Sequence, residues 1–243
     1  MTVESGELQS GGRGGRNLTY GLLETLGRAI VVGHYDRTVF PTEAVLATRY
    51  GVSRSVTREA VKMLTAKGLL TARPRKGTTV QPSGLWNLFD ADVLRWLLER
   101  KFSVRLLRQF SDLRVAIEPA AAALAARHGD ADGVAAIARG FDRMAAADAG
   151  DDDPLEADIA FHLAILRASG NPFYMQFQDL VETALRTSIR FTNRFNGRTA
   201  NLPQHRAVLS AIEARNPDGA HRAMKSLIDA VLALVATVEA SEG

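Results

Sequence analysis

Residues 50–64 read YGVSRSVTREAVKML, and residues 67–80 continue as KGLLTARPRKGTTV. The first stretch predicts a helix, because Ser53 has the hydroxyl side chain preferred at a helix N-cap and Gly68 follows as a stop. The second stretch contains two short extended runs around a Pro and a Gly, a pattern typical of a hairpin. A helix followed by a hairpin is the second half of a winged helix-turn-helix.

The preceding residues supply the first half of the same fold. Apolar residues at helical spacing predict a helix over 20–33, and Thr42 is placed to cap a short helix that ends at Gly51. The order helix, helix, helix, hairpin predicts a winged helix-turn-helix over residues 17–82, behind a disordered Gly/Ser/Arg-rich tail at 1–16.

The helix after Ser53 has the charge of a DNA recognition helix. Arg54 and Arg58 are four residues apart, so their guanidinium groups project together near the end that such a helix presents to the major groove. Residues 49–76 hold eight basic residues and one acid. The expected DNA-facing residues are Arg54, Ser55, Arg58 and Lys62 on the helix and Arg73, Arg75 and Lys76 on the hairpin.

Composition divides the chain and excludes several chemistries. Residues 1–80 hold 12 Lys/Arg against 6 Asp/Glu, and residues 81–243 hold 18 against 21, so only the first part is expected to meet a polyanion. There is no cysteine, which excludes disulfides, thiolate metal sites and cysteine nucleophiles. The N-terminus lacks the apolar core of a signal peptide and no apolar run is long enough to cross a membrane, so a cytoplasmic protein without a membrane partner is expected.

The remainder of the chain predicts an all-helical domain. Helical periodicity with Gly and Asn-Pro stops predicts helices at 90–99, 103–127, 131–147, 155–168, 172–195, 203–214 and 217–240. Short connections between long helices indicate an antiparallel bundle over 90–240, after a linker at 83–89. The fold class is therefore mostly α.

Two groups of polar residues lie on apolar helix faces of this bundle. Arg114 lies within the stripe Leu107, Phe110, Ile117 and Ala121, where it serves either a structural salt bridge or a ligand carboxylate. Asp158 and His162 are four residues apart and His205 faces inward on another helix. One carboxylate and two imidazoles suit a divalent metal such as Zn, Ni or Mn, and hydrogen-bonded core histidines are the alternative.

Residues 40–80 resemble the GntR family of bacterial regulators, whose pattern is close to LPSE … GVSRxxVREAL … GL … RxGxGTFV. The resemblance implies that Arg54, Ser55, Val56 and Arg58 face DNA and that the wing tip is Arg75–Gly77, which adds Val56 and Gly77 to the site. Two residues depart from the pattern. Ala44 stands where the family often has a DNA-contacting arginine, and Thr57 stands at a usually apolar position.

Residues 113–126, 158–172 and 205–217 resemble the FadR-type C-terminal ligand domain, called FCD. Many such domains bind a divalent metal through one Asp and three His beneath an effector carboxylate, and Asp158, His162 and His205 match three of these ligands. Leu227 stands at the fourth position, and His221 is six residues earlier on another face. The metal is therefore either held by three protein ligands or absent.

Residues 86–96, WNLFDADVLRW, resemble the subgroup of sugar-acid regulators of the galactonate-operon type. The resemblance implies a hexonate-like effector that meets Arg114, Asp158, His162, Thr187, Ser188, Arg190 and His205. Trp86 and Trp96 are expected to anchor the linker onto the bundle.

The preferred interpretation is a transcriptional regulator, expected to be a repressor, that binds a palindromic DNA operator as a homodimer under the control of a small carboxylate. Two alternatives remain. A 2-His-1-carboxylate metal enzyme would leave the DNA-binding module unexplained, and an architectural DNA-binding protein would leave the inward polar groups unexplained.

Overall fold

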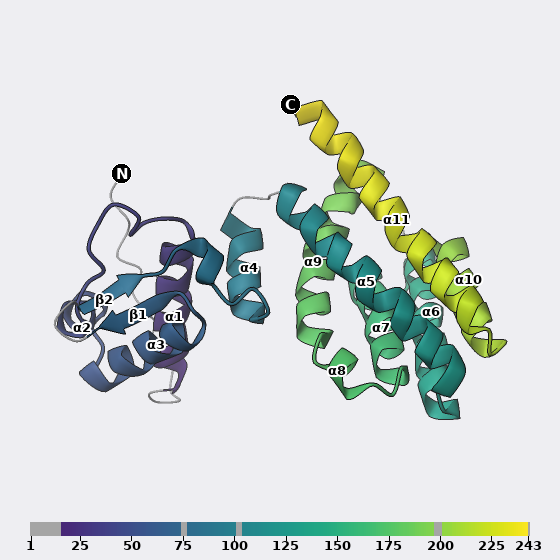
Figure 1. Cartoon of the computed structure of the whole chain (residues 1–243), viewed down its shortest axis with the longest axis horizontal. Coiled ribbons are helices and arrows are strands. Elements are labelled where there is room, and N and C mark those ends of the chain that lie inside the picture. Colours follow the sequence, from purple (N-terminus) through teal and green to yellow (C-terminus); the bar gives the residue numbers. More distant parts are fainter. Residues whose placement is uncertain (1–15, 74–76, 101–103, 197–200, 243) are drawn as a thin grey trace. The chain divides into compact units, whose positions relative to one another are not determined.

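The computed structural model describes residues 16–73, 77–100, 104–196 and 201–242, with side chains except at 16, 99–100, 188–196 and 238–242. The chain divides into two compact units, Met1–Lys101 and Phe102–Gly243 (Figure 1). Residues 1–15 of the predicted tail and the predicted wing residues Arg75 and Lys76 lie outside the described part of the chain, and the last residue of that tail, Arg16, begins the first helix.

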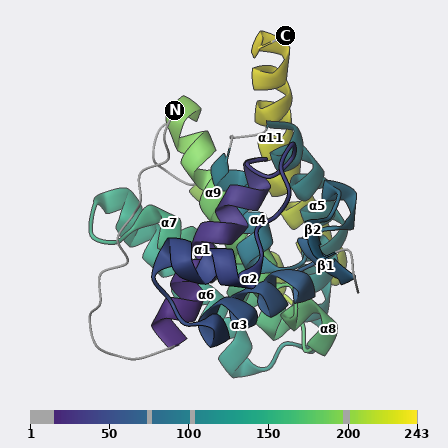
Figure 2. The same cartoon turned by 90° about the vertical axis from the view of Figure 1, so that its left-hand side faces the viewer.

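The first unit is the predicted winged helix-turn-helix followed by one more helix. Its elements are α1 (Arg16–Val31), α2 (Glu43–Tyr50), α3 (Arg54–Ala66), β1 (Leu70–Arg73), β2 (Gly77–Val80), a 3-10 turn η1 (Ser83–Leu85) and α4 (Ala91–Arg100). Strands β1 and β2 pair antiparallel, with Leu70 opposite Val80 and Arg73 opposite Gly77. Figures 1 and 2 show the three helices α1, α2 and α3 gathered together with the hairpin beside them.

Local capping signals place the two helices of the helix-turn-helix. The Thr42 hydroxyl accepts from the Val45 N–H at 3.4 Å, and the Ser53 hydroxyl accepts from the Val56 N–H at 3.3 Å. Gly51, with φ +63°, adopts the left-handed conformation between the helices that most side chains disfavour. Both predicted N-caps are therefore confirmed, because each depends only on residues up to three positions away.

Helix α4 belongs to the first unit, so its expected placement in the bundle is wrong. Trp96 is 1% exposed and lies in the same core as Leu22, Leu26 and Ile30 of α1. Its indole ring occupies space beside Gly27, where a Cβ would lie 2.3 Å from the ring. Trp86 packs against this core as well and donates its indole N–H to the Gln81 carbonyl at 2.9 Å. The two tryptophans therefore anchor the segment onto the DNA-binding unit rather than onto the bundle.

Ion pairs also attach α4 to this unit. Lys67, just after α3, contacts Asp90 and Asp92 at 2.8 Å each. Arg95 forms a bidentate pair with Glu24 of α1, with both N–O distances at 2.8 Å. Helix α4 is thus connected to α1 by packing and by charge, and to the residue that follows α3 by charge.

The second unit is a bundle of helices. Its elements are α5 (Val104–His128), α6 (Ala131–Ala149), α7 (Pro154–Ala168), α8 (Pro172–Met175), α9 (Gln178–Asn196), α10 (Leu202–Glu213) and α11 (Pro217–Glu242). The helix predicted over 172–195 is two helices, because the backbone turns at residues 176–177 while Tyr174 and Phe177 both pack against the core.

Small side chains let the bundle helices approach closely. Ala121, Ala122, Ala125 and Ala126 of α5 are each 0% exposed, and α5 runs alongside α11 over much of its length (Figure 1). Among the described residues, no helix is long and apolar enough to cross a membrane.

Candidate functional site

The exposed face of α3 carries the residues predicted to meet DNA. Arg54, Ser55, Arg58 and Lys62 are all exposed, and the helix begins at Arg54 directly after its cap. Backbone N–H groups at a helix N-terminus also favour an anion such as phosphate. The geometry matches a recognition helix that presents its first turns to the major groove.

Two of these cations have acidic neighbours. The Arg58 Nε lies 3.5 Å from the Glu43 carboxylate of α2, and the Lys62 Nζ lies 3.0 Å from the Glu59 carboxylate one turn before it. Arg54 has no carboxylate partner within the ranges that the structure describes. Arg54 therefore presents its full charge, whereas Arg58 is oriented by a weak, solvent-exposed pair.

Val56 lies mostly inward, and the DNA-facing role that the resemblance implies for it stays a prediction. Its side chain is 9% exposed and packs in the first unit's core with Ala60 and Leu64, one and two turns further along α3. Thr57 is 0% exposed, and its hydroxyl donates to the Ser53 carbonyl at 3.2 Å. The helical period thus directs both residues inward. Because the Thr57 hydroxyl is hydrogen-bonded within its own helix, Thr57 can occupy a position that is usually apolar.

The hairpin contributes one described cation. Arg73 is exposed at the end of β1, and Gly77, which opens β2, is exposed with φ +75°. Because L side chains rarely adopt this conformation, the tight end of the wing requires a glycine there.

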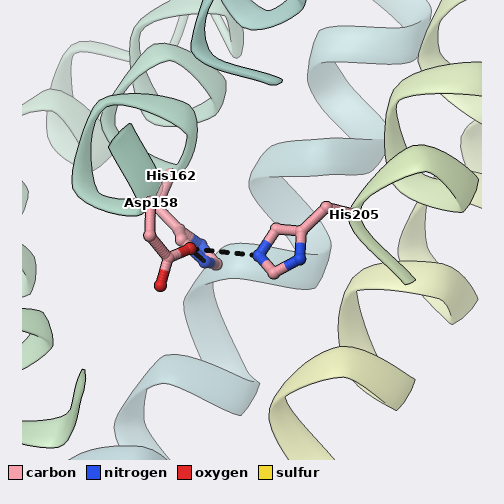
Figure 3. A group of neighbouring side chains, drawn as sticks. All are labelled: Asp158, His162 and His205. Carbon is pink, nitrogen blue, oxygen red and sulfur yellow. Dashed lines mark hydrogen bonds and ion pairs between the residues drawn. The ribbon is translucent and has the colours of Figure 1, made fainter. Parts of the chain in front are cut away.

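The second candidate site is a buried group of three metal-ligating side chains (Figure 3). Asp158 and His162 come from successive turns of α7, and His205 comes from the first turn of α10. Asp153 caps α7, and Asn201 caps α10 by accepting from the Gln204 N–H at 3.2 Å. One donor atom from each member of the group lies within 4.8 Å of the others.

The two imidazoles present the same ring nitrogen to one oxygen. His162 Nε2 lies 3.4 Å and His205 Nε2 lies 3.1 Å from Asp158 Oδ1. Their Nδ1 atoms point away to other acceptors, His162 to Glu118 Oε2 at 2.5 Å and His205 to the Asn201 carbonyl at 2.8 Å. Each Nδ1 therefore carries a hydrogen, so each Nε2 faces Asp158 either as a lone pair or as a second N–H.

The charges around the group favour a positive charge between these donors. Burial disfavours an ionised Asp158, but hydrogen bonds and charge from His162 and His205 outweigh it and lower its pKa. Burial also disfavours the His162 imidazolium, yet Glu118 and Asp158 outweigh it and raise the pKa of His162 to about 9. A proton on Nε2 or a metal ion can supply that positive charge.

The donor set fits a divalent metal. Two donors about 2.1 Å from one ion and about 100° apart lie about 3.2 Å from each other, which agrees with the 3.1 and 3.4 Å observed here. Histidine ligands that donate their other N–H to a carboxylate or backbone carbonyl are the usual arrangement at metal sites. Leu227, at the fourth ligand position implied by the resemblance, is 6% exposed within the apolar core, and His221 is exposed.

Arg114 forms the structural salt bridge, one of its two predicted roles. It is 2% exposed, and its Nε donates to Glu118 Oε1 at 2.6 Å. Burial raises the pKa of the Glu118 carboxyl, but the charges of Arg114 and His162 outweigh this and lower it to about 2. Glu118 was not among the predicted site residues, although its position four residues after Arg114 on one helix is a signal for this pair.

The remaining predicted effector contacts are only partly described. Thr187 is half-buried on α9, and its hydroxyl donates to the Thr183 carbonyl of its own helix at 3.3 Å. The side chains of Ser188 and Arg190 lie outside the described residues.

Comparisons with known proteins cover both units. Residues 24–80 match the bacterial regulatory proteins of the gntR family, and residues 109–230 match the FCD domain. An uncharacterized HTH-type transcriptional regulator, YieP of Escherichia coli K12, is 35% identical over 88% of this chain and 93% of its own length. The galactonate operon transcriptional repressor of the same organism is 33% identical over 87% and 94%. The solved structure of E. coli McbR/YncC shares the fold at 17% identity, with a TM-score of 0.53 over 91% of this chain and 98% of that one.

Proposed function

This chain belongs to the gntR family of bacterial regulatory proteins and carries an FCD domain; it is a DNA-binding transcriptional regulator, and we propose that it is a repressor released from its operator by a small carboxylate. Membership of a regulator family also removes the metal-dependent enzyme from the two alternatives. The proposed site of control is the Asp158, His162 and His205 group.

The observation that carries the proposal is the charge of that buried group. With a divalent ion bound, the ion and Arg114 bring three positive charges, whereas Glu118 and Asp158 bring two negative charges. One buried positive charge is then left without a partner, which is unfavourable away from water. A ligand with one carboxylate balances it, so a monocarboxylate is the effector class that the site favours. Zinc, nickel and manganese all suit these donors, and the bound ion would supply the positive charge that receives the carboxylate.

The hexonate class is supported by similarity rather than by geometry. The galactonate operon repressor is 33% identical to this chain. A sugar acid offers several hydroxyls beside its carboxylate, and Thr187, Ser188 and Arg190 remain predicted contacts for them. Arg114 is not among the proposed carboxylate ligands, because Glu118 already occupies its guanidinium.

Operator binding is proposed to use the exposed face of α3. Arg54 and Arg58 are proposed to read bases, with Ser55, Lys62, Arg73, Arg75 and Lys76 on the phosphates. Two copies of the chain in the cytoplasm would place two such helices on a palindromic operator. The effector acts only if it binds the DNA-free state more tightly, and DNA then weakens effector binding by the same factor.

The test is a fluorescence anisotropy titration of the full chain on the DNA upstream of its own gene, with random DNA of equal length at the same salt. Saturating galactonate or gluconate is expected to weaken binding to the upstream DNA by about 5- to 150-fold, the usual range of allosteric coupling. Acetate is the control for a bare carboxylate, and a chelator tests whether the response needs metal.

Each outcome tests a different part of the proposal. If another carboxylate releases the DNA and hexonates do not, the sugar-acid class is wrong while the carboxylate site stands. If no carboxylate acts with metal present, the proposed effector control is wrong. Equal affinity for upstream and random DNA would instead favour the alternative of an architectural DNA-binding protein.

A further inference from the structure

His162 lies between two carboxylates that play different parts. Its Nε2 faces Asp158 Oδ1 at 3.4 Å, and its Nδ1 lies 2.5 Å from Glu118 Oε2 on the opposite side of the ring. Because an ionised carboxylate can only accept, the hydrogen of a neutral imidazole is held on Nδ1. The Nε2 lone pair is then available toward Asp158 and His205.

Glu118 cannot be a ligand of the same ion. Its bonded oxygen lies against Nδ1, and the two imidazole nitrogens point in divergent directions across the ring. Its other oxygen accepts from Arg114 Nε at 2.6 Å. The Glu118 side chain is 1% exposed, and these two neighbours account for both of its oxygens.

Arg114 fixes the orientation of the Glu118 carboxylate beside His162. The guanidinium is 2% exposed and lies one turn before Glu118 on α5. Its Nε donates to Glu118 Oε1 at 2.6 Å, which leaves Oε2 turned toward His162 Nδ1 as an acceptor. The pair therefore decides which ring nitrogen of His162 carries the lone pair.

His205 provides an internal comparison within the same site. Its Nδ1 lies 2.8 Å from the Asn201 carbonyl, which also accepts the His205 backbone N–H at 3.2 Å. The start of α10 thus orients this ring with backbone alone. One histidine is held by a side-chain ion pair and the other by a helix terminus.

We propose that the Arg114–Glu118 pair is a positioning layer of the metal centre, in which Glu118 holds His162 as the Nδ1–H tautomer and so directs its Nε2 toward the ion. This inference rests on the proposed metal site of the second unit. Zinc affinity then depends on Glu118 although Glu118 does not touch the ion.

Two double variants of the full chain isolate this role. Arg114→Met with Glu118→Leu removes the acceptor for Nδ1, and Arg114→Met with Glu118→Gln keeps a neutral oxygen acceptor there. Neither variant leaves a buried charge unpaired, and replacing a buried ion pair with apolar side chains is often neutral for stability. Lys225→Gln with Asp229→Asn removes an exposed i,i+4 pair of α11 as the control.

Zinc affinity is measured by calorimetry against a competing chelator, and the tautomers are read by nitrogen-15 NMR of labelled histidines in the zinc-free protein at alkaline pH, where the rings are neutral. The double variant with Glu118→Leu is expected to bind zinc about 10- to 100-fold more weakly and to lose the Nδ1–H signature of His162 while His205 keeps its own. The double variant with Glu118→Gln is expected to keep the tautomer and most of the affinity.

The outcomes separate this inference from the proposed function. Wild-type zinc affinity in the double variant with Glu118→Leu overturns the positioning layer and leaves the metal site intact. An equal loss of affinity in both double variants, with the His162 tautomer kept in each, overturns it as well, because the tautomer would not be the cause. If the wild type binds neither zinc nor manganese, both the layer and the metal part of the proposed function are wrong, and hexonate release of DNA is still decided by anisotropy.

Discussion

Gly140 of α6 meets the backbone of α7 at Phe161, one residue before His162, and Gly140→Ala tests how tightly the bundle holds the metal-ligating group. A Cβ at this position would lie 2.8 Å from the Phe161 Cα and 3.0 Å from its backbone nitrogen. Ordinary contacts begin at 3.4 Å, so α7 would have to retreat by about 0.6 Å. No side-chain rotation can relieve the conflict, because both facing atoms belong to the backbone.

The expected magnitude is a balance of two opposing effects. Alanine in place of glycine favours the helix by up to about 1 kcal/mol, whereas overpacking a well-filled core disfavours the fold by about 1–3 kcal/mol. The net loss should be about 1–2 kcal/mol, or roughly 3–8 °C in the Tm of a domain of this size. Because His162 follows Phe161, the displacement should also weaken zinc binding by moving one donor.

The assay is thermal unfolding with and without zinc, compared with wild type. Ala145→Gly, at an exposed position of the same helix, calibrates the propensity effect and should lower stability by up to about 1 kcal/mol. A Gly140→Ala protein that is as stable as wild type, with unchanged zinc affinity, would refute the argument that α6 and α7 meet backbone to backbone beside the site.

Three further predictions address the first unit. Arg54→Ala should weaken binding to the upstream DNA by about 1–3 kcal/mol, measured by anisotropy. Arg139→Ala, which changes an exposed arginine on α6, should leave that affinity unchanged. If both variants bind equally weakly, the assignment of α3 as the recognition helix is wrong. Trp96→Ala should destabilise the first unit by about 3–5 kcal/mol, seen in its thermal transition, because a ring that is 1% exposed leaves a large cavity, and a loss below about 1 kcal/mol would contradict its anchoring role. Hydrogen bonding to Arg95 lowers the pKa of the Glu24 carboxyl to about 2. The ion pair between Glu24 and Arg95 therefore stabilises the fold fully above the unfolded pKa of about 4.3, and this stabilisation is lost as the pH falls toward 2. Because the pair is partly exposed, Glu24→Gln should lower stability by less than about 1 kcal/mol at neutral pH, and a difference that persists undiminished as the pH is lowered through 4 toward 2 would refute this.

The sequence by itself determined the order of elements and their caps. Thr42, Ser53 and Gly51 act on residues of the same turn, so their effect can be inferred without knowing what packs nearby. The stripe of Leu22, Leu26 and Ile30 repeats with the helical period, and all three are buried as that period predicts. The FCD resemblance and inward spacing together also predicted the group of Asp158, His162 and His205, whose donors do meet.

Tertiary structure alone decided which neighbours these residues acquire. Trp96 is separated from Gly27 by most of the first unit, and nothing in its own helix indicates that it packs onto α1 rather than onto the bundle. Glu118 and His162 are 44 residues apart, so the contact that sets the ring orientation depends on how α5 and α7 pack. Local signals act within a few residues of the chain, whereas burial, ion pairing and tautomer depend on side chains brought together only when the helices pack.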